Sequence, residues 1–235
     1  AVINADDPHA GLMRLLAGDR ECLEFGLEKP APISARYELR ESGSHVEITA
    51  PSGEAHVALQ QPGLHNVRNA LAAAAVGIAL GVDLGSIATG LNRMTAVKGR
   101  LVRKVGLSGA VVIDDSYNAN PDSVRAAIEV LAAAKGTKFL VLGDMGEIGD
   151  EGPQMHAEVG EAARNAGIDA LYALGQLSAQ AAAAFGHGAL HFGAAHELID
   201  ALQPRLQAGA TVLVKGSRFM AMERVVDAIT IGGKQ

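Results

Sequence analysis

The sequence predicts an α/β protein in which a smaller antiparallel region precedes a doubly wound, mostly parallel sheet. Two observations support this prediction. After about residue 98, short apolar runs alternate with longer amphipathic segments, and strands that alternate with helices form parallel sheets through right-handed crossovers. Before that residue, short alternating runs are separated by Pro, Gly and Ser, which is typical of an antiparallel meander.

Length and composition narrow the class of protein. The chain has 235 residues, 49% of them hydrophobic and 20% charged, with a formal net charge of −6. Domains of roughly 100–200 residues allow one large or two modest domains here, and the apolar content argues against disorder. The single cysteine, Cys22, cannot form an internal disulfide, which fits a reducing cytosol. The longest apolar run, 70–80, is about half of the ~20 residues that a membrane helix needs. The acidic balance and the few aromatic residues argue against a nucleic-acid binder. A cytoplasmic protein is therefore expected.

The region before residue 98 is expected to open with a strand over 1–5 and a helix that ends near Ala17. Turn residues separate the next predicted strands, which together form the meander and cover 21–27, 33–39, 45–49 and 54–59. The predicted turns between them lie at 29–32, 41–43 and 51–53. Two helices follow, over about 66–80 and 84–92.

The region after residue 98 is expected to be a separate domain, joined to the first by a hinge at 98–100. Its apolar runs predict strands over 101–105, 110–114, 138–142, 170–174 and 211–214. The segments between the runs predict helices over 121–134, 154–166, 178–185, 194–207 and 220–229.

The first group of candidate site residues follows the strand predicted over 110–114. Ligands of open α/β sheets bind beyond the carboxyl ends of the strands. Asp114 and Asp115 end this strand, and carboxylates there accept hydrogen bonds from ribose hydroxyls or hold a metal. Asn120 is followed by proline, so a helix N-cap explains it well. Capping does not explain Asp115, Tyr117 or Asn118, for which a functional role and a structural role remain open.

Two further groups follow the strands predicted over 138–142 and 211–214. The glycines of 143–151 suggest a phosphate loop, but four acidic residues in that segment would repel an anion. A cationic partner or a solvated loop fits this segment better. At the other strand, Lys215, Ser217 and Arg218 precede a helix, which makes either a carboxylate or phosphate site or a charged surface turn.

A polar cluster opens the Ala-rich helix of the first region. His65 and Asn69 are i, i+4 neighbours, and Asn66 and Asn69 are i, i+3 neighbours. An Asn side chain offers both a donor and an acceptor, which suits the edge of an adenine. The alternative is an Asn66 cap with solvated neighbours, which does not explain Asn69.

Several common motifs are missing from the chain. The sequence contains no Walker-type phosphate loop, no strand-linked G-x-G-x-x-G, no H-E-x-x-H and no G-x-S-x-G. His187 and His191 are four residues apart, but the glycines on both sides of His187 favour a turn over a metal-binding helix. Cys22 is expected to pack within a strand, and no metal ligand is predicted in this chain.

Five strings, taken together, resemble the Mur ligase family. They are Gly-Leu-His-Asn-Val-Arg-Asn at 63–69, Lys-Gly-Arg at 98–100, Asp-Asp-Ser-Tyr-Asn-Ala-Asn-Pro at 114–121, Leu-Gly-Asp-Met-Gly-Glu at 142–147 and Val-Lys-Gly-Ser-Arg at 214–218. The strings at 114–121 and 142–147 are similar to those of the member that adds D-alanyl-D-alanine to UDP-N-acetylmuramoyl-tripeptide. The order and spacing agree over essentially the whole chain.

The resemblance implies an ATP-dependent, Mg²⁺-assisted ligase of peptidoglycan synthesis that forms an acyl phosphate. It implies that 1–97 is the second half of the central ATPase domain and that 98–235 is a Rossmann-like C-terminal domain. By position, Asn69 would contact the adenine with His65 and Asn66 beside it. Arg100 and Asp115 would hold the ribose, and Arg100 would also reach the phosphates.

The resemblance also implies roles near the γ-phosphate and the incoming dipeptide. Tyr117 is assigned to catalysis together with Arg100 and Asp115. The set assigned to the dipeptide is Asn118, Asn120, Lys215, Ser217 and Arg218, of which the last three would hold its carboxylate. The loop over 143–151 would favour its ammonium.

Parts of the family pattern are not in this sequence. The UDP-binding domain and the first half of the central domain, with the phosphate loop and the Mg²⁺ ligands, are expected to lie outside it. The chain is therefore interpreted as a fragment that is inactive alone. Two alternatives remain: a sister ligase that adds a different amino acid, and a non-catalytic nucleotide-binding module.

Overall fold

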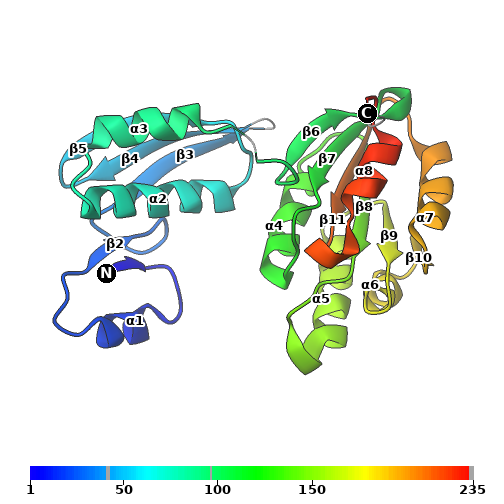
Figure 1. Ribbon diagram of the computed structural model, residues 1–235, viewed down its shortest axis with the longest axis horizontal. Helices are drawn as coiled ribbons and strands as arrows, with labels where there is room; N and C mark the ends of the chain where they lie inside the picture. Colours follow the sequence, from blue (N-terminus) through cyan, green and yellow to red (C-terminus); the bar gives the residue numbers. More distant parts are fainter. Residues whose placement is uncertain (41–42, 96, 233–235) are drawn as a thin grey trace. The chain divides into compact units, whose positions relative to one another are not determined.

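The computed structural model describes residues 1–40, 43–95 and 97–232. The chain forms two compact units, Ala1–Thr95 and Ala96–Gln235 (Figure 1). Within the described ranges, no helix is both long and apolar enough to cross a membrane.

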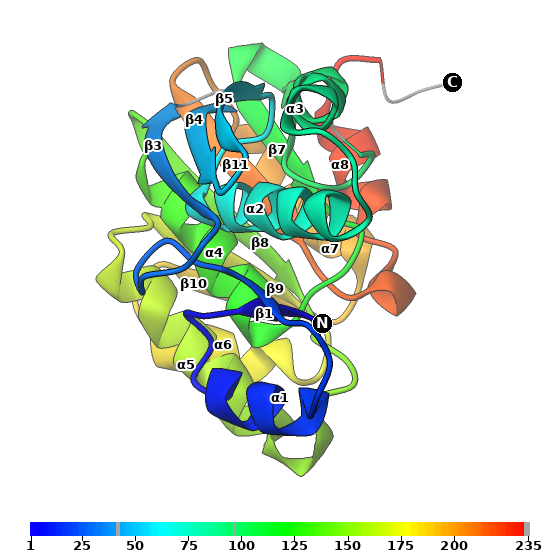
Figure 2. The ribbon, with the colours of Figure 1, turned by 90° about the vertical axis from the view of Figure 1, so that its left-hand side faces the viewer.

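The first unit is built around one long helix. Its elements are β1 (Val2–Asn4), α1 (Ala10–Ala17), β2 (Leu23–Phe25), β3 (Ser34–Arg40), β4 (Gly43–Ala50), β5 (Gly53–Leu59), α2 (Leu64–Ala79) and α3 (Leu84–Arg93). Strands β3, β4 and β5 form an antiparallel sheet in that order. Figures 1 and 2 show α2 between this sheet and the β1–β2 pair, with α1 on the far side of the pair. The core lies on both sides of α2, where Val67 and Leu71 pack with Phe25 and Ile48.

Two predictions for the first unit were wrong in part. The predicted strand over 21–27 is shorter and is not in the meander: β2 pairs in parallel with β1, Val2 opposite Leu23. Cys22, expected to pack within that strand, precedes it and is exposed. The meander itself is confirmed as β3–β4–β5. Of the predicted turn at 41–43, Glu41 and Ser42 lie outside the described residues.

The second unit is a six-stranded sheet with helices on both faces (Figure 1). Its strands are β6 (Val102–Val105), β7 (Val111–Asp115), β8 (Thr137–Gly143), β9 (Ala170–Leu174), β10 (Ala189–Phe192) and β11 (Ala210–Lys215). Its helices are α4 (Pro121–Ala132), α5 (Gly152–Asn165), α6 (Ser178–Phe185), α7 (Ala195–Leu202) and α8 (Glu223–Ile229). The strand order is β10-β9-β8-β11-β7-β6. Among the pairs of described strands, the edge pair β6–β7 is antiparallel and the others are parallel. The predicted mostly parallel, doubly wound sheet is confirmed.

Successive side chains along each strand point to opposite faces of the sheet and contribute to two separate cores. Ile113 and Leu213 point to one face, where they pack with α4, α5 and α6. Their neighbours Val112 and Val212 point to the other face, toward α7 and α8. Side chains that are apolar on both sides of a strand are expected where helices cover both faces of a sheet. This arrangement leaves the carboxyl ends of the parallel strands as the place for polar groups.

Three element predictions for this unit need correction. Strand β10 was not predicted: it is a four-residue edge strand beside β9. Helix α7 ends at Leu202, and a 3₁₀ turn containing Pro204 follows it, since proline cannot continue the helical hydrogen bonds. Helix α8 begins at Glu223, after a 3₁₀ turn over Arg218–Met220 and the left-handed residue Ala221.

Candidate functional site

A buried ion pair joins the ends of two neighbouring strands. The register of β11 and β7 sets Lys215 beside Asp115, and the Lys215 Nζ lies 2.6 Å from the Asp115 Oδ2. Both residues are buried, at 3% and 8% exposure. The same ammonium donates to the carbonyl oxygen of Asn118 at 2.9 Å. Lys215 therefore connects the end of β11 to the loop that follows β7.

Asp115 also fixes the backbone before β6. Its Oδ1 accepts a hydrogen bond from the Leu101 N–H at 3.1 Å. Leu101 has a φ of 52°, a left-handed conformation that a non-glycine residue keeps only where its surroundings hold it. Burial raises the pKa of the Asp115 carboxyl above its ordinary value, and the ammonium of Lys215 opposes this rise. Both oxygens of the carboxylate thus have partners inside the protein, although each keeps a second lone pair for a ligand.

Asp114, the other carboxylate of this strand end, has its own partners. The Lys104 ammonium lies 2.9 Å from the Asp114 Oδ2. The Ser116 hydroxyl donates to the Asp114 Oδ1 at 2.6 Å. Lys104 did not feature in the sequence-based prediction, and its pairing with Asp114 depends on the edge position of β6.

Arg100 and Tyr117 form the exposed part of this strand end. The Arg100 guanidinium lies 4.6 Å from the centre of the Tyr117 ring, a distance at which a cation and an aromatic face attract. Tyr117 is 46% exposed. The Tyr117 N–H donates to the carbonyl of Gly99 at 3.0 Å. Gly99 has a φ of 74°, and a Cβ there would lie 3.0 Å from the Tyr117 nitrogen, so a glycine is required at this close approach.

Asn120 acts as the cap of α4. Its side-chain oxygen accepts from the Ser123 N–H at 2.8 Å, and the Ser123 hydroxyl accepts from the Asn120 N–H at 3.0 Å. This reciprocal pattern is a capping box. The structural role considered for Asn120 is therefore present, and Asn118 contributes its backbone carbonyl to Lys215.

Ser217 ties together three loops at the same edge of the sheet. Its hydroxyl donates to the Ala119 carbonyl at 3.1 Å and accepts from the Gly146 N–H at 2.8 Å. Ser217 is 4% exposed, so this hydroxyl is enclosed by the protein. Arg218 differs: it lies at the surface, where its guanidinium is 2.9 Å from Glu223, and its side chain is 65% exposed.

The acidic loop after β8 is more ordered than a solvated loop. Asp144 is buried, and its carboxylate accepts hydrogen bonds from the N–H groups of Gln176 at 3.0 Å and Ser178 at 2.7 Å. His156 of α5, which is not among the predicted site residues, accepts from the Met145 N–H at 2.9 Å. These contacts give the loop a defined backbone.

In the first unit, the polar cluster lies on α2 as predicted, but the helix begins two residues earlier. Gly63, with a φ of 100°, precedes the first helical residue. Asn66 is therefore not the cap; its side-chain amide donates to the Pro62 carbonyl at 2.8 Å. His65 and Asn66 are partly buried, and Asn69 is exposed.

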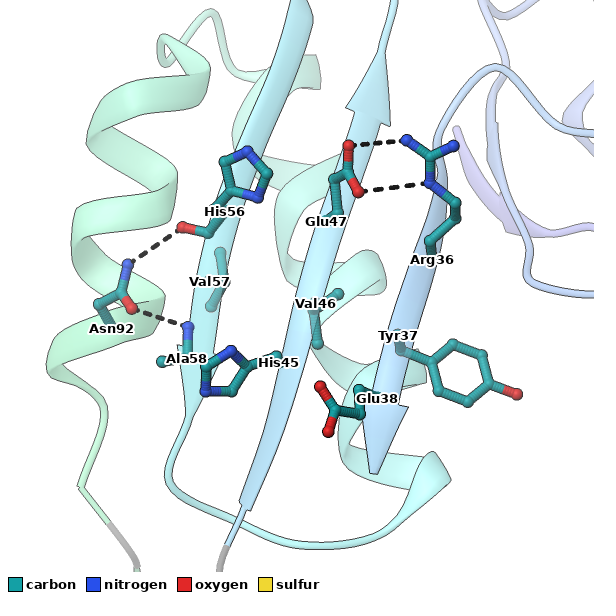
Figure 3. A pocket seen from close by; sticks show the side chains of 10 residues that line it. All are labelled: Arg36, Tyr37, Glu38, His45, Val46, Glu47, His56, Val57, Ala58 and Asn92. Atoms are coloured by element: carbon teal, nitrogen blue, oxygen red, sulfur yellow. Dashed lines mark hydrogen bonds and ion pairs between the residues drawn. The ribbon is translucent and has the colours of Figure 1, made fainter. Parts of the chain in front are cut away.

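An open groove of about 530 Å³ lies on the outer face of the β3–β4–β5 sheet. Figure 3 shows Arg36 paired with Glu47 across the strands, and Asn92 of α3 bound to the backbone of β5. The Asn92 side-chain oxygen accepts from the Ala58 N–H at 2.8 Å, which covers the edge of the sheet. The lining residues include none of the predicted site residues.

The second unit thus has the arrangement of an α/β protein that binds its ligand at the carboxyl edge of a parallel sheet. Buried carboxylates and a buried ammonium order the loops there, and an exposed arginine on each of two loops offers cationic groups for nucleotide or carboxylate oxygens.

Comparison with known families identifies this class more closely. The Mur ligase middle domain matches residues 1–77, and the domain described as "Mur ligase, glutamate ligase domain" matches residues 99–218. The chain belongs to the Mur ligase family.

Similar proteins support this assignment. The chain is 38% identical over 242 residues to the UDP-N-acetylmuramoyl-tripeptide–D-alanyl-D-alanine ligase of Escherichia coli, covering 99% of this chain and 52% of that protein. It is similar in structure to MurF from Acinetobacter baumannii (TM-score 0.87, 34% identity, 96% of this chain and 50% of that one). It is also similar to the MurF ligase of Thermotoga maritima in complex with ADP (TM-score 0.82, 25% identity, 97% of this chain and 52% of that one). The chain spans about half the length of the curated relatives it matches.

Proposed function

We propose that this chain contributes to a ligase that joins D-alanyl-D-alanine to UDP-N-acetylmuramoyl-tripeptide in peptidoglycan synthesis, at the expense of ATP. The observation that carries the proposal is the 38% identity, over 99% of the chain, to a ligase of that name. In this proposal 1–97 belongs to the central ATP-binding domain and 98–235 is the C-terminal domain.

The reaction of such a ligase has two steps. An oxygen of the acceptor carboxylate attacks the γ-phosphorus of ATP, and ADP leaves. The dipeptide amine then attacks the acyl carbon of the acyl phosphate, loses a proton, and phosphate leaves. Catalysis of this kind depends on positioning and on stabilising developing charge. The described residues hold no group of three or more His, Cys, Asp or Glu side chains placed to bind a metal. Mg²⁺ is commonly held by one or two carboxylates together with substrate phosphates. The two carboxylates at the end of β7, Asp114 and Asp115, are each paired with a lysine ammonium, which opposes the binding of a cation, so they do not fit a Mg²⁺ site.

The geometry divides the predicted site residues of the second unit into two kinds. Lys215 and Ser217 are buried and bonded within the protein, so in our proposal they order the loops beside the substrate. Arg218 is the exposed cation of its loop and binds the carboxylate of the dipeptide. Arg100 and Tyr117, also exposed, interact with the nucleotide, and Asp115 accepts from its ribose.

The dipeptide assignment predicts a selective defect. In a full-length ligase that contains this chain, Arg218→Ala should raise KM for D-alanyl-D-alanine by about tenfold or more, since a charge-assisted hydrogen bond is lost. KM for ATP should stay within about twofold. Arg224→Ala, an exposed arginine on α8, serves as the matched control and should change neither. A change in KM for ATP alone would reassign Arg218. In substrate competition with the unmodified full-length ligase, preferential ligation of a single amino acid over D-alanyl-D-alanine would overturn the proposed reaction.

The adenine assignment is tested at Asn69, which is exposed on α2. In a full-length ligase that contains this chain, Asn69→Ala should weaken ATP binding by about 1–3 kcal/mol, the cost of leaving one polar contact unmade. Isothermal titration with a non-hydrolysable ATP analogue measures the change. Asn165→Ala, at an exposed asparagine of α5, is the control. Unchanged affinity in Asn69→Ala would remove this residue from the nucleotide site.

A further inference from the structure

A fully buried histidine supports the loop that follows β8. His156 is on α5 and is 0% exposed. Its Nε2 lies 2.9 Å from the Met145 nitrogen, and its Nδ1 lies 2.7 Å from the Gly152 carbonyl oxygen. A carbonyl oxygen can only accept, and a backbone N–H can only donate. The Nδ1 therefore carries the proton and the Nε2 is the acceptor, so His156 is a neutral imidazole in one defined tautomer.

The backbone held by His156 leads directly to Ser217. Met145 is followed by Gly146, whose N–H donates to the Ser217 hydroxyl at 2.8 Å. That hydroxyl then donates to the Ala119 carbonyl. The Ser217 N–H in turn donates to the Asp144 carbonyl at 3.0 Å. The loop held by His156 and the loop of Ser217 are thus bonded to each other twice.

The residue on the other side of Arg218 also rests on Gly146. A Cβ on Gly146 would lie 2.7 Å from the Phe219 ring, so the ring packs directly against this backbone. Glu147, next in the chain, has a φ of 58°, and a non-glycine residue keeps that conformation only where its surroundings over-determine it. The loop conformation on which Ser217 and Phe219 depend therefore requires fixed contacts, and the bond to His156 is one of them.

We propose that His156 is a positioning residue, which sets the place of Arg218 through the Met145–Gly146 backbone. The imidazole is fully buried, and it holds the loop on which both neighbours of Arg218 rest. This inference rests on the proposed function in one respect, the assignment of the dipeptide carboxylate to Arg218. Its structural part can be tested independently.

The first test reads the tautomer in the unmodified chain. Imidazole nitrogen resonances of the ¹⁵N-labelled protein at neutral pH should show His156 with a protonated Nδ1 and an unprotonated Nε2. A protonated Nε2 would place two donors face to face at Met145 and would overturn the proposal. This measurement needs no variant, so it stands even if substitution prevents folding.

The second test compares two variants of the acceptor. His156→Gln keeps an oxygen near the position of Nε2, and His156→Leu removes the acceptor with a side chain of similar bulk. In His156→Leu, amide exchange at Met145 and Gly146 should be about tenfold faster, as the loss of one hydrogen bond implies. In His156→Gln it should stay within about threefold of the unmodified chain. His196→Leu, at an exposed histidine of α7, controls for the change of residue and should leave both amides unchanged.

The third test links the loop to the substrate. In the full-length ligase, His156→Leu should raise KM for D-alanyl-D-alanine by about tenfold and leave KM for ATP unchanged, and His156→Gln should restore most of the loss. Equal exchange in the Leu and Gln variants would overturn the positioning role. Faster exchange with an unchanged KM would overturn the placement of Arg218 by His156 if Arg218→Ala raises this KM, and would overturn the dipeptide assignment of Arg218 if Arg218→Ala leaves it unchanged.

Discussion

Replacing Lys215 by methionine should lower the free energy of unfolding of the second unit by about 3–5 kcal/mol, the range for breaking a buried ion pair on one side. Methionine has a similar length but no charge. It would leave the Asp115 carboxylate buried at 8% exposure without its cation, and the Asn118 carbonyl without its donor. The cost comes from the groups left behind, more than from the attraction that is lost.

Amide exchange along β7 and β11 measures this change without assuming that the two units unfold together. The amides of residues 1–95 should not respond. Lys135→Met, at an exposed lysine after α4, should change stability by less than about 0.5 kcal/mol. The double variant Asp115→Asn/Lys215→Met should recover much of the loss, because neither buried charge remains. A loss below about 1 kcal/mol in Lys215→Met would show that the pair is not desolvated.

The same variant has an expected pH dependence. Burial raises the pKa of Asp115 even with Lys215 present. In Lys215→Met, β11 would no longer supply a cation that opposes this rise in the pKa. Between the unfolded pKa of about 3.9 and the raised folded pKa, the folded state then binds more protons than the unfolded state. Stability therefore falls as pH rises through this window. The defect of Lys215→Met should shrink as the pH is lowered from neutral toward about 4, and a defect that grows on acidification would contradict this sign.

The sequence was sufficient to predict the parallel sheet and the strand ends that collect polar groups, but not which of those groups are buried. Lys215 and Asp115 are 100 residues apart, and they meet because β11 lies next to β7 in the strand order. Residue spacing contains no information about that order. From the sequence, Lys215 and Ser217 can therefore be interpreted as groups that bind a substrate. In the structure, their partners are the carboxylate of Asp115 and the backbone of the protein.

His156 shows what could have been found from the sequence. It lies on the buried side of α5 with Val159, Gly160 and Ala163, at the helical spacing of an apolar face. A histidine on such a face is expected to have hydrogen-bond partners inside the protein. The identity of those partners depends on the path of the loop after β8, which local sequence does not determine. The pairing of β2 with β1 could not be predicted for the same reason, because a strand of three residues does not specify its neighbour.

Gly160 on α5 should be among the least replaceable positions of the second unit. A Cβ there would lie 2.1 Å from the Ala181 carbonyl oxygen and 2.8 Å from the Ala181 Cα. These are backbone atoms of α6, so no side-chain rotation can relieve the overlap, and the two helices would have to separate. Gly160→Ala should cost about 3 kcal/mol, at the upper end of overpacking penalties.

The intrinsic preference for helix acts in the opposite direction, because alanine in a helix interior is favoured over glycine by about 1 kcal/mol. Gly90→Ala isolates this preference: Gly90 lies within α3, and nothing is within 4 Å of its added Cβ. Gly90→Ala should therefore stabilise the first unit by about 0.5–1 kcal/mol, whereas Gly160→Ala should destabilise the second unit. Amide exchange in the two units of each single variant measures both signs. Stabilisation by Gly160→Ala would show that α5 and α6 can move apart at little cost.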